Sequence, residues 1–91
     1  MNTLDPPGEV RISPSNNITA EVGQQVHINC TATSDGEIVD FQWWKNDMRV
    51  SDSSTLRFAS IQPNNAGRYY CNVTNRYGHE TATLNLYGKI V

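Results

Sequence analysis

The 91-residue sequence has no long hydrophobic run, no excess of charge of one sign and no helical period of its apolar residues. A transmembrane helix needs about 20 apolar residues in a row, and no segment of the printed sequence reads as such a helix or as a signal peptide. The formal net charge is −2, and the seven lysines and arginines are scattered along the chain. Nucleic-acid-binding domains carry a basic face, so we expect neither a nucleic-acid partner nor direct membrane insertion.

Residue patterns that support catalysis or metal binding are also missing. The chain has no Gly-x-Ser-x-Gly elbow, no glycine-rich phosphate loop and no closely spaced group of histidines and cysteines. Its two histidines, His27 and His79, stand apart and are expected at the surface. Nothing brings a nucleophile, a base and an orienting group together. We therefore expect no enzyme, no cofactor and no metal site.

Two cysteines, Cys30 and Cys71, are the most informative residues that are present. An even number at this spacing favours a disulfide bond formed in an oxidising compartment. On the chain-entropy model, closing a loop of this length stabilises a fold by about 4 kcal/mol. The alternative is a pair of buried, reduced thiols in an intracellular domain.

Three Asn-x-Thr sequons for N-glycosylation begin at Asn17, Asn29 and Asn72. Three sequons in so short a chain favour the secretory route over the intracellular alternative. Asn29 is the weakest acceptor candidate, because the middle residue of its sequon is Cys30. We expect an extracellular, secreted location, in the matrix or at the cell surface.

Apolar and polar residues alternate with a period of two, which predicts β-strands along the whole chain. Strands are predicted at 9–13, 18–22 and 26–32, and further strands follow. The inward-pointing residues of the later strands are Val39, Phe41, Trp43, Leu56, Phe58, Ile61, Tyr69, Cys71, Val73, Ala82, Leu84 and Leu86. We expect one domain over 7–87, with 1–6 as a linker or cloning residues and 88–91 as a linker to a next module.

The pattern Cys30…Trp43…Leu56-x-Phe58…Ala66-Gly67-x-Tyr69-x-Cys71 resembles an immunoglobulin-superfamily domain of the I-set kind. The resemblance covers nearly all of residues 7–87. It implies an all-β fold, an immunoglobulin-like two-sheet Greek-key sandwich with one inter-sheet disulfide between the two cysteines. It also implies that Trp43 packs on this disulfide, that Leu56 belongs to the core, and that the hydroxyl of Tyr69 bonds upstream backbone.

One position departs from the pattern of this family. Where the family usually has an aspartate, the chain has Asn65. The amide can still accept a hydrogen bond, but the bond lacks charge assistance, which costs about 1 kcal/mol of local stability.

Within the family, the run from Cys71 to Leu84 is similar to the immunoglobulin repeats of perlecan-type basement-membrane heparan sulfate proteoglycans. This narrower resemblance implies a structural and adhesion module, one repeat of a tandem array in a matrix proteoglycan or adhesion protein. Its partners would be matrix or cell-surface proteins and neighbouring repeats; heparin or heparan sulfate is less favoured, since the basic residues are scattered. The alternatives are a ligand-binding ectodomain repeat of a signalling receptor and an intracellular muscle-type structural spacer.

Strand parity predicts where a partner binds. Trp43 and Tyr69 are predicted to point inward, so the residue that follows each of them points outward. These residues are Trp44 and Tyr70, whose strands are neighbours in one sheet of this fold. Aromatic residues are enriched at the centres of interfaces, so we expect this pair to bind a partner, with Tyr87 bordering the same face. The alternative is that a neighbouring loop shields the pair.

Parity also places one sequon on the face of the aromatic pair. Asn72 shares the parity of Tyr70, so a glycan at Asn72 is expected to cover this face. Asn29 is expected to face outward from the opposite sheet, and Asn17 is expected on an edge.

Overall fold

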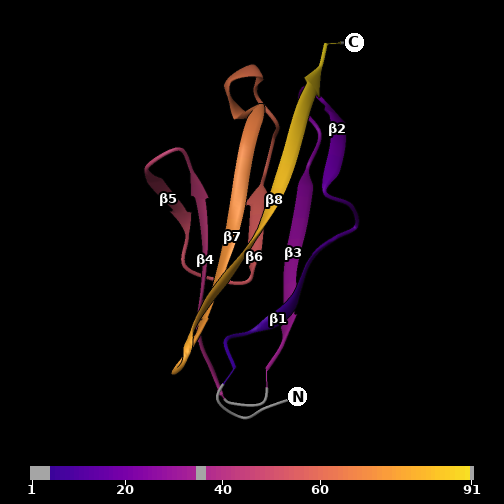
Figure 1. The fold of residues 1–91 in the computed structure, drawn as a ribbon. Coiled ribbons are helices and arrows are strands. Elements are labelled where there is room, and N and C mark those ends of the chain that lie inside the picture. The colour runs from indigo at the N-terminus through magenta and orange to yellow at the C-terminus, as the bar shows by residue number, and fades with distance from the viewer. Residues whose placement is uncertain (1–4, 35–36, 91) are drawn as a thin grey trace.

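The computed structural model describes residues 5–34 and 37–90, and of Val39 only the backbone. Within these ranges the chain forms eight strands and one short 3₁₀ helix, η1. The elements are β1 Gly8–Ser13, β2 Asn17–Glu21, β3 Val26–Thr33, β4 Ile38–Lys45, β5 Met48–Ser51, β6 Thr55–Phe58, η1 Pro63–Asn65, β7 Gly67–Asn75 and β8 Gly78–Lys89. The strands build two facing layers (Figure 1).

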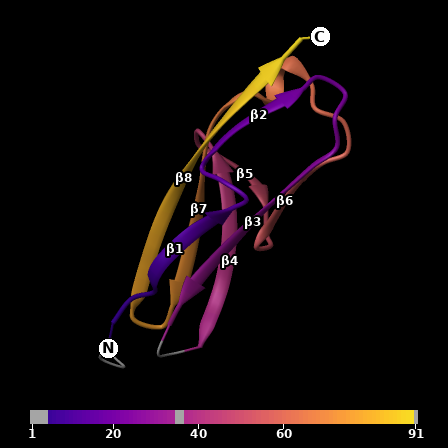
Figure 2. The same ribbon diagram turned by 90° about the vertical axis from the view of Figure 1, so that its right-hand side faces the viewer.

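The two layers differ in size. One sheet has three strands in the order β1-β3-β6, and the other has five in the order β2-β8-β7-β4-β5. Figure 2 shows the chain crossing between the layers, for example from β6 to β7. The disulfide joins Cys30 on β3 to Cys71 on β7 and therefore links the sheets. The predicted all-β, two-sheet sandwich with one inter-sheet disulfide is confirmed.

Burial along β3 shows how the alternation in the sequence sets the layers. Val26, Ile28 and Cys30 are buried, whereas His27 and Asn29 between them are exposed. Successive side chains of a strand point to opposite faces, so an alternating sequence gives one face to the core and one to solvent. This alternation holds the apolar residues of both sheets in one shared core.

The first two strands belong to different sheets. β1 is antiparallel to β3, whereas β2 is parallel to the last part of β8. Pro14 follows β1 and cannot donate a ladder hydrogen bond, which explains why the first strand ends there. The sequence predicted two short strands here, but the period of two carries no information about their partners.

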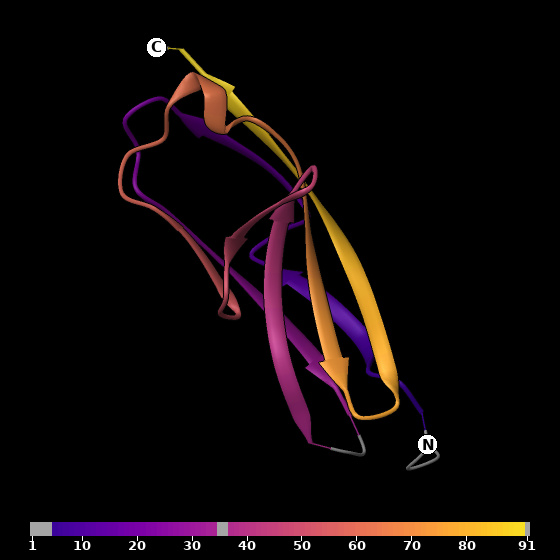
Figure 3. The same cartoon turned by 90° about the vertical axis from the view of Figure 1, so that its left-hand side faces the viewer.

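The chain enters and leaves the sandwich at opposite ends. β1 begins near one end of the long axis and β8 ends at the other (Figures 1 and 3). The domain measures 48 × 22 × 17 Å along its principal axes. This placement suits repeats that follow one another end to end.

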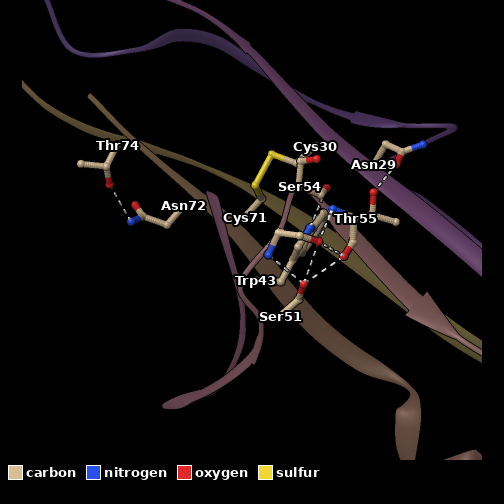
Figure 4. The surroundings of a disulfide bond; sticks show 10 residues. Asn29, Cys30, Trp43, Ser51, Ser54, Thr55, Cys71, Asn72 and Thr74 are labelled. Carbon is tan, nitrogen blue, oxygen red and sulfur yellow. Dashed lines mark hydrogen bonds between the residues drawn. A yellow bond between two sulfur atoms is a disulfide. The ribbon is translucent and has the colours of Figure 1, made fainter. Parts of the chain in front are cut away.

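The core is built around Trp43 and the disulfide. Trp43 is fully buried, and its indole N–H donates to the carbonyl oxygen of Ser54 at 3.1 Å. The same carbonyl accepts the backbone N–H of Cys30 at 2.8 Å. The only polar atom of the buried indole therefore has a partner, and the loop between β5 and β6 is tied to both sheets (Figure 4).

Tyr69 holds the corner between β6 and β7. Its hydroxyl donates to the backbone carbonyl of Asn65, and burial raises the pKa of its phenol. The side-chain oxygen of Asn65 accepts the backbone N–H of Gln62 at 2.7 Å. The ammonium of Lys45 lies 5.3 Å from the centre of the Tyr69 ring and donates to the carbonyl of Asn64 at 2.7 Å. Asparagine therefore fills the corner position with a neutral hydrogen bond.

Asn75 anchors the opposite end of the sandwich. It is 3% exposed and is the one buried polar residue in the described part of the chain. Its amide nitrogen donates to the carbonyl of Asp5 at 2.9 Å and to the hydroxyl of Ser34 at 3.1 Å. Its side-chain oxygen accepts the backbone N–H of Tyr77 at 2.8 Å. One side chain thus ties the β7–β8 hairpin to two other segments.

Candidate interaction face

A row of four side chains crosses the outer face of the five-stranded sheet. Trp44 on β4 is the register partner of Arg49 on β5 and of Tyr70 on β7, and Tyr70 is in turn the partner of Thr83 on β8. Register partners of antiparallel strands project from the same side of a sheet, with Cβ atoms about 4.5–5.5 Å apart. We call the surface formed by Arg49, Trp44, Tyr70 and Thr83 the aromatic face.

The centre of the aromatic face is a stacked ring pair. The ring centroids of Trp44 and Tyr70 are 6.4 Å apart, and their planes are inclined by 8°. Such pairs contribute about 0.5–1.5 kcal/mol beyond the area they bury. The indole N–H of Trp44 donates to the side-chain oxygen of Gln42 at 3.1 Å. Both rings are half-buried, so each keeps part of its surface open to solvent.

A second, polar row runs beside this stack. Asn72 on β7 is the register partner of Gln42 on β4 and of Thr81 on β8. The amide nitrogen of Asn72 lies 3.4 Å from the hydroxyl oxygen of Thr74, two residues further along the strand. Amide and hydroxyl groups therefore border the stacked rings on one side.

Two arginines lie near the stack, and one of them is paired with an acid. Arg49 pairs with Asp52 at 2.9 Å, and both side chains are at least half exposed, so this ion pair contributes little to stability. Arg68 is exposed and stands two residues before Tyr70 on β7. The face combines apolar rings with groups that form hydrogen bonds, which suits a contact surface.

The structure brings together two of the three predicted partner-binding residues. Trp44 and Tyr70 are in contact, whereas Tyr87 lies four residues along β8 from Thr83, opposite Thr19 of β2. Tyr87 is 54% exposed and borders the same outer side at the end where β2 joins the sheet. The role of all three residues in binding stays a prediction.

The outer face of the three-stranded sheet has a different composition. The exposed side chains of its three strands are Glu9, Arg11, Ser13, His27, Asn29, Thr31, Thr33 and Arg57. Among the described residues of this face there is no Phe, Tyr or Trp. The side-chain oxygen of Asn29 accepts a hydrogen bond from the hydroxyl of Thr55 at 2.8 Å. Figure 4 shows Asn29 and Asn72 on opposite sides of the disulfide.

The described residues contain no arrangement with evident chemistry. They hold no group of three or more His, Cys, Asp or Glu side chains that could bind a metal ion. Both cysteines are used in the disulfide, and both histidines are exposed. Within the same ranges, no helix has the length and apolar character needed to cross a bilayer.

The structural roles of two residues were not predicted from the sequence. Arg49 was missed because residues 48–53 were expected to be irregular, so no strand was paired with β4 there. The two-residue loop between Lys45 and Met48 was a usable signal, since it pairs Trp44 with Arg49. Asn75 was missed as a buried anchor, although its place just before the β7–β8 hairpin was a usable signal. A polar residue that continues the inward series Tyr69, Cys71, Val73 must either be buried with partners or break the strand.

Comparison with known proteins gives the class of this domain. Residues 7–75 match the immunoglobulin domain family, and the chain belongs to it. Among solved structures, the N-terminal four immunoglobulin domains of Dscam1 isoform 4.44 superimpose with a TM-score of 0.82 at 23% identity, over 93% of this chain and 21% of that chain. This likeness supports the fold alone.

Related sequences are long proteins of which the chain spans a small part. It is 37% identical over 70 residues to the mouse B-cell receptor CD22, covering 76% of this chain and 8% of that protein. It is 34% identical over 77 residues to the human cell adhesion molecule DSCAM, covering 77% and 4%. It is 29% identical over 83 residues to the Titin homolog of Caenorhabditis elegans, covering 78% and, after rounding, 0%. The chain thus resembles the immunoglobulin repeats of adhesion and receptor proteins.

Proposed function

We propose that this domain is a non-catalytic interaction repeat of an extracellular adhesion or receptor protein, and that its aromatic face binds a protein partner. The half-exposed Trp44–Tyr70 stack carries this proposal. It lies on strands that are paired on both sides, so its ring surfaces, and not an open sheet edge, are available for contact. Aromatic and arginine side chains supply most of the binding energy at many interfaces.

The arrangement of the chain supports a place within a tandem array. Entry and exit lie at opposite ends of the long axis, so neighbouring repeats can extend in line without covering the sheet faces. Neighbouring repeats of the same chain are therefore further partners, and they contact the ends of the sandwich. Tyr87, close to the exit end, is suited to such a contact.

The parent protein is proposed to be a cell-surface molecule. The similarity to proteins named as a receptor and an adhesion molecule supports this proposal. The inter-sheet disulfide and the three sequons support passage through the oxidising secretory pathway. A matrix proteoglycan parent is supported by the residues from Cys71 to Leu84 and is distinguished by what precedes and follows this repeat in the full chain.

The binding proposal is tested with oxidatively refolded bacterial protein, which carries no glycan. The chain is tetramerised and applied to a panel of purified cell-surface ectodomains and matrix proteins. For any protein that binds, the Trp44→Ser/Tyr70→Ser variant is expected to lose at least about tenfold in affinity. The matched variant His27→Ser/Arg57→Ser changes the opposite outer face and is expected to bind normally. Equal affinity of both variants would contradict the proposal.

The elongated shape favours a second candidate, a structural spacer that carries load along its long axis. An intracellular, muscle-type spacer would hold its cysteines reduced, whereas the extracellular proposal requires the bond between Cys30 and Cys71. Free-thiol titration of the parent protein, isolated from its native source under alkylating conditions, separates the two. Two free thiols per domain would favour the spacer.

A further inference from the structure

We infer that Asn72 carries an N-linked glycan whose first sugars lie on the Trp44–Tyr70 stack, so that glycosylation controls access to the aromatic face. N-glycosylation takes place in the secretory pathway, so the modification depends on the proposed function in this one respect. Asn72 differs from the acceptors of the other two sequons in its surroundings.

The strand geometry places every part of the sequon on one side of the sheet. Tyr70, Asn72 and Thr74 are alternate residues of β7, and alternate residues of a strand share a face. The hydroxyl that completes the sequon lies 3.4 Å from the acceptor amide. A sugar attached to Asn72 thus starts one side-chain row away from the ring of Tyr70.

The attachment is a transfer from a polyprenyl-diphosphate-linked oligosaccharide, which the secretory pathway supplies. The amide nitrogen of Asn72 forms a bond to C1 of the first N-acetylglucosamine. The bond between this carbon and the diphosphate oxygen breaks, and the lipid diphosphate leaves with the electron pair. The amide loses one proton, so the linkage remains a neutral secondary amide.

The surroundings of Asn72 offer the sugar both apolar surface and hydrogen-bond partners. The C–H-rich face of a pyranose ring is apolar, and the stacked rings two positions away offer apolar surface to cover. The hydroxyl and acetamido groups of the sugar need hydrogen-bond partners, and Gln42 and Thr81 flank Asn72 on the neighbouring strands. Covalent attachment also keeps the sugar at high effective concentration next to the rings.

The sequon at Asn29 lacks such a platform. It projects from the three-stranded sheet, whose described outer side chains include no Phe, Tyr or Trp. Its side-chain oxygen is held by the hydroxyl of Thr55 at 2.8 Å. Its sequon also spans Cys30, which is joined to the opposite sheet. A glycan at Asn29 would extend into solvent.

The sequon at Asn17 lies at the edge of the five-stranded sheet. Asn17 contacts the amides of Asn16 and Asn85, at 3.3 and 3.4 Å. Tyr87, the register partner of Thr19, is a single exposed ring without a stacking partner in the described structure. A glycan at Asn17 therefore has less apolar surface to cover than one at Asn72.

A glycan on the stack and a protein on the stack exclude one another. The glycosylated domain would keep Tyr87 and the β5 edge free for protein contact, whereas the unglycosylated domain would offer the whole aromatic face. Occupancy of Asn72 would therefore act as a switch between two binding states of the same repeat.

The experiment compares two variants of one sequon residue, produced in secreting eukaryotic cells behind a signal sequence. Thr74→Ser keeps the sequon and Thr74→Val removes it, while both keep Asn72. Glycopeptide mass spectrometry is expected to find glycan at Asn72 in the wild type and in the serine variant only. When the glycan is trimmed to a single N-acetylglucosamine, the glycosylated protein is expected to melt a few degrees above the same protein without glycan. The Tyr70→Ser substitution is expected to abolish this difference in melting temperature.

A direct measurement keeps the inference testable if the ring variants fold poorly. In trimmed wild-type protein, nuclear Overhauser contacts are expected between the acetyl methyl protons of the sugar and the ring protons of Trp44 or Tyr70. An unoccupied Asn72, or an occupied one without these contacts, would overturn the inference. Neither result bears on the proposed partner binding, which is measured on protein without glycan. If the Trp44→Ser/Tyr70→Ser variant bound its partner as tightly as the His27→Ser/Arg57→Ser variant, the binding proposal would fail, and the assignment of the glycan to Asn72 would be unaffected.

Discussion

The outer face of the three-stranded sheet and the outer face of the five-stranded sheet share one core and one alternating pattern, yet differ in what they present. The first carries charged and hydroxyl side chains, whereas the second carries a stacked aromatic pair. Nothing in the fold requires the rings, because the core is complete without them. The inward residues of this sandwich therefore account for its fold, whereas the outward residues of one sheet form the surface for which partner binding is proposed.

The largest effect is expected from the bond that joins the two faces. Replacing Cys30 and Cys71 by alanine should lower the free energy of unfolding by about 4 kcal/mol. Denaturant unfolding monitored by tryptophan fluorescence measures this loss. In this variant, the rate of amide hydrogen exchange should increase more in the three-stranded sheet than in the five-stranded sheet, because it has fewer strands to support it. Equal acceleration in both sheets would show that the sandwich opens as one unit.

A smaller loss is expected at the end of the sandwich. Asn75→Ala removes three hydrogen bonds from a buried position and leaves their partners unsatisfied. The expected cost is about 1–3 kcal/mol in the free energy of unfolding, measured by denaturant titration. Asn75→Asp keeps an acceptor for Tyr77 but removes the donor to Asp5 and Ser34 and places a carboxylate in a buried position, so it should cost at least as much as alanine. A change below about 0.5 kcal/mol for alanine would contradict the anchoring role.

Matched substitutions on the two outer faces should differ in their effect on stability. Trp44→Ser should lower the free energy of unfolding by about 1 kcal/mol, because it removes the stack with Tyr70. His27→Ser, on the opposite face, should change it by less than about 0.5 kcal/mol. Thermal unfolding of the unglycosylated proteins measures both. Equal changes in the two variants would show that the stacked rings add no stability to the five-stranded sheet.

The smallest effect is expected from alkaline pH at the Tyr69 corner. Burial raises the pKa of this phenol above its ordinary value of 10.0, so the folded state favours the neutral form. Its contribution to stability is complete below pH 10.0 and is lost as the pH rises through the raised pKa. Chemical denaturation across this pH range measures the slope, and Tyr69→Phe should flatten it. An unchanged slope in the phenylalanine variant would assign the dependence to other groups.

Sequence reasoning predicted the layers of the fold because the period of two and the positions of Cys30, Trp43 and Cys71 determine which residues point inward. Parity also predicted that Trp44 and Tyr70 lie together. It could not predict the sheet that β2 joins, because pairing depends on the path of the chain and not on which side a residue faces. It missed Arg49, because the segment after the β4–β5 turn was expected to be irregular and was not paired with β4.

The pairing of β2 with β8 has a mechanical consequence. The two strands run parallel and close to the point where the chain leaves the sandwich. A pull on the exit end acts along these strands, so their hydrogen bonds are loaded in shear and must break together, not one after another. The domain should therefore resist stretching along its long axis better than it resists peeling at the β4–β5 hairpin.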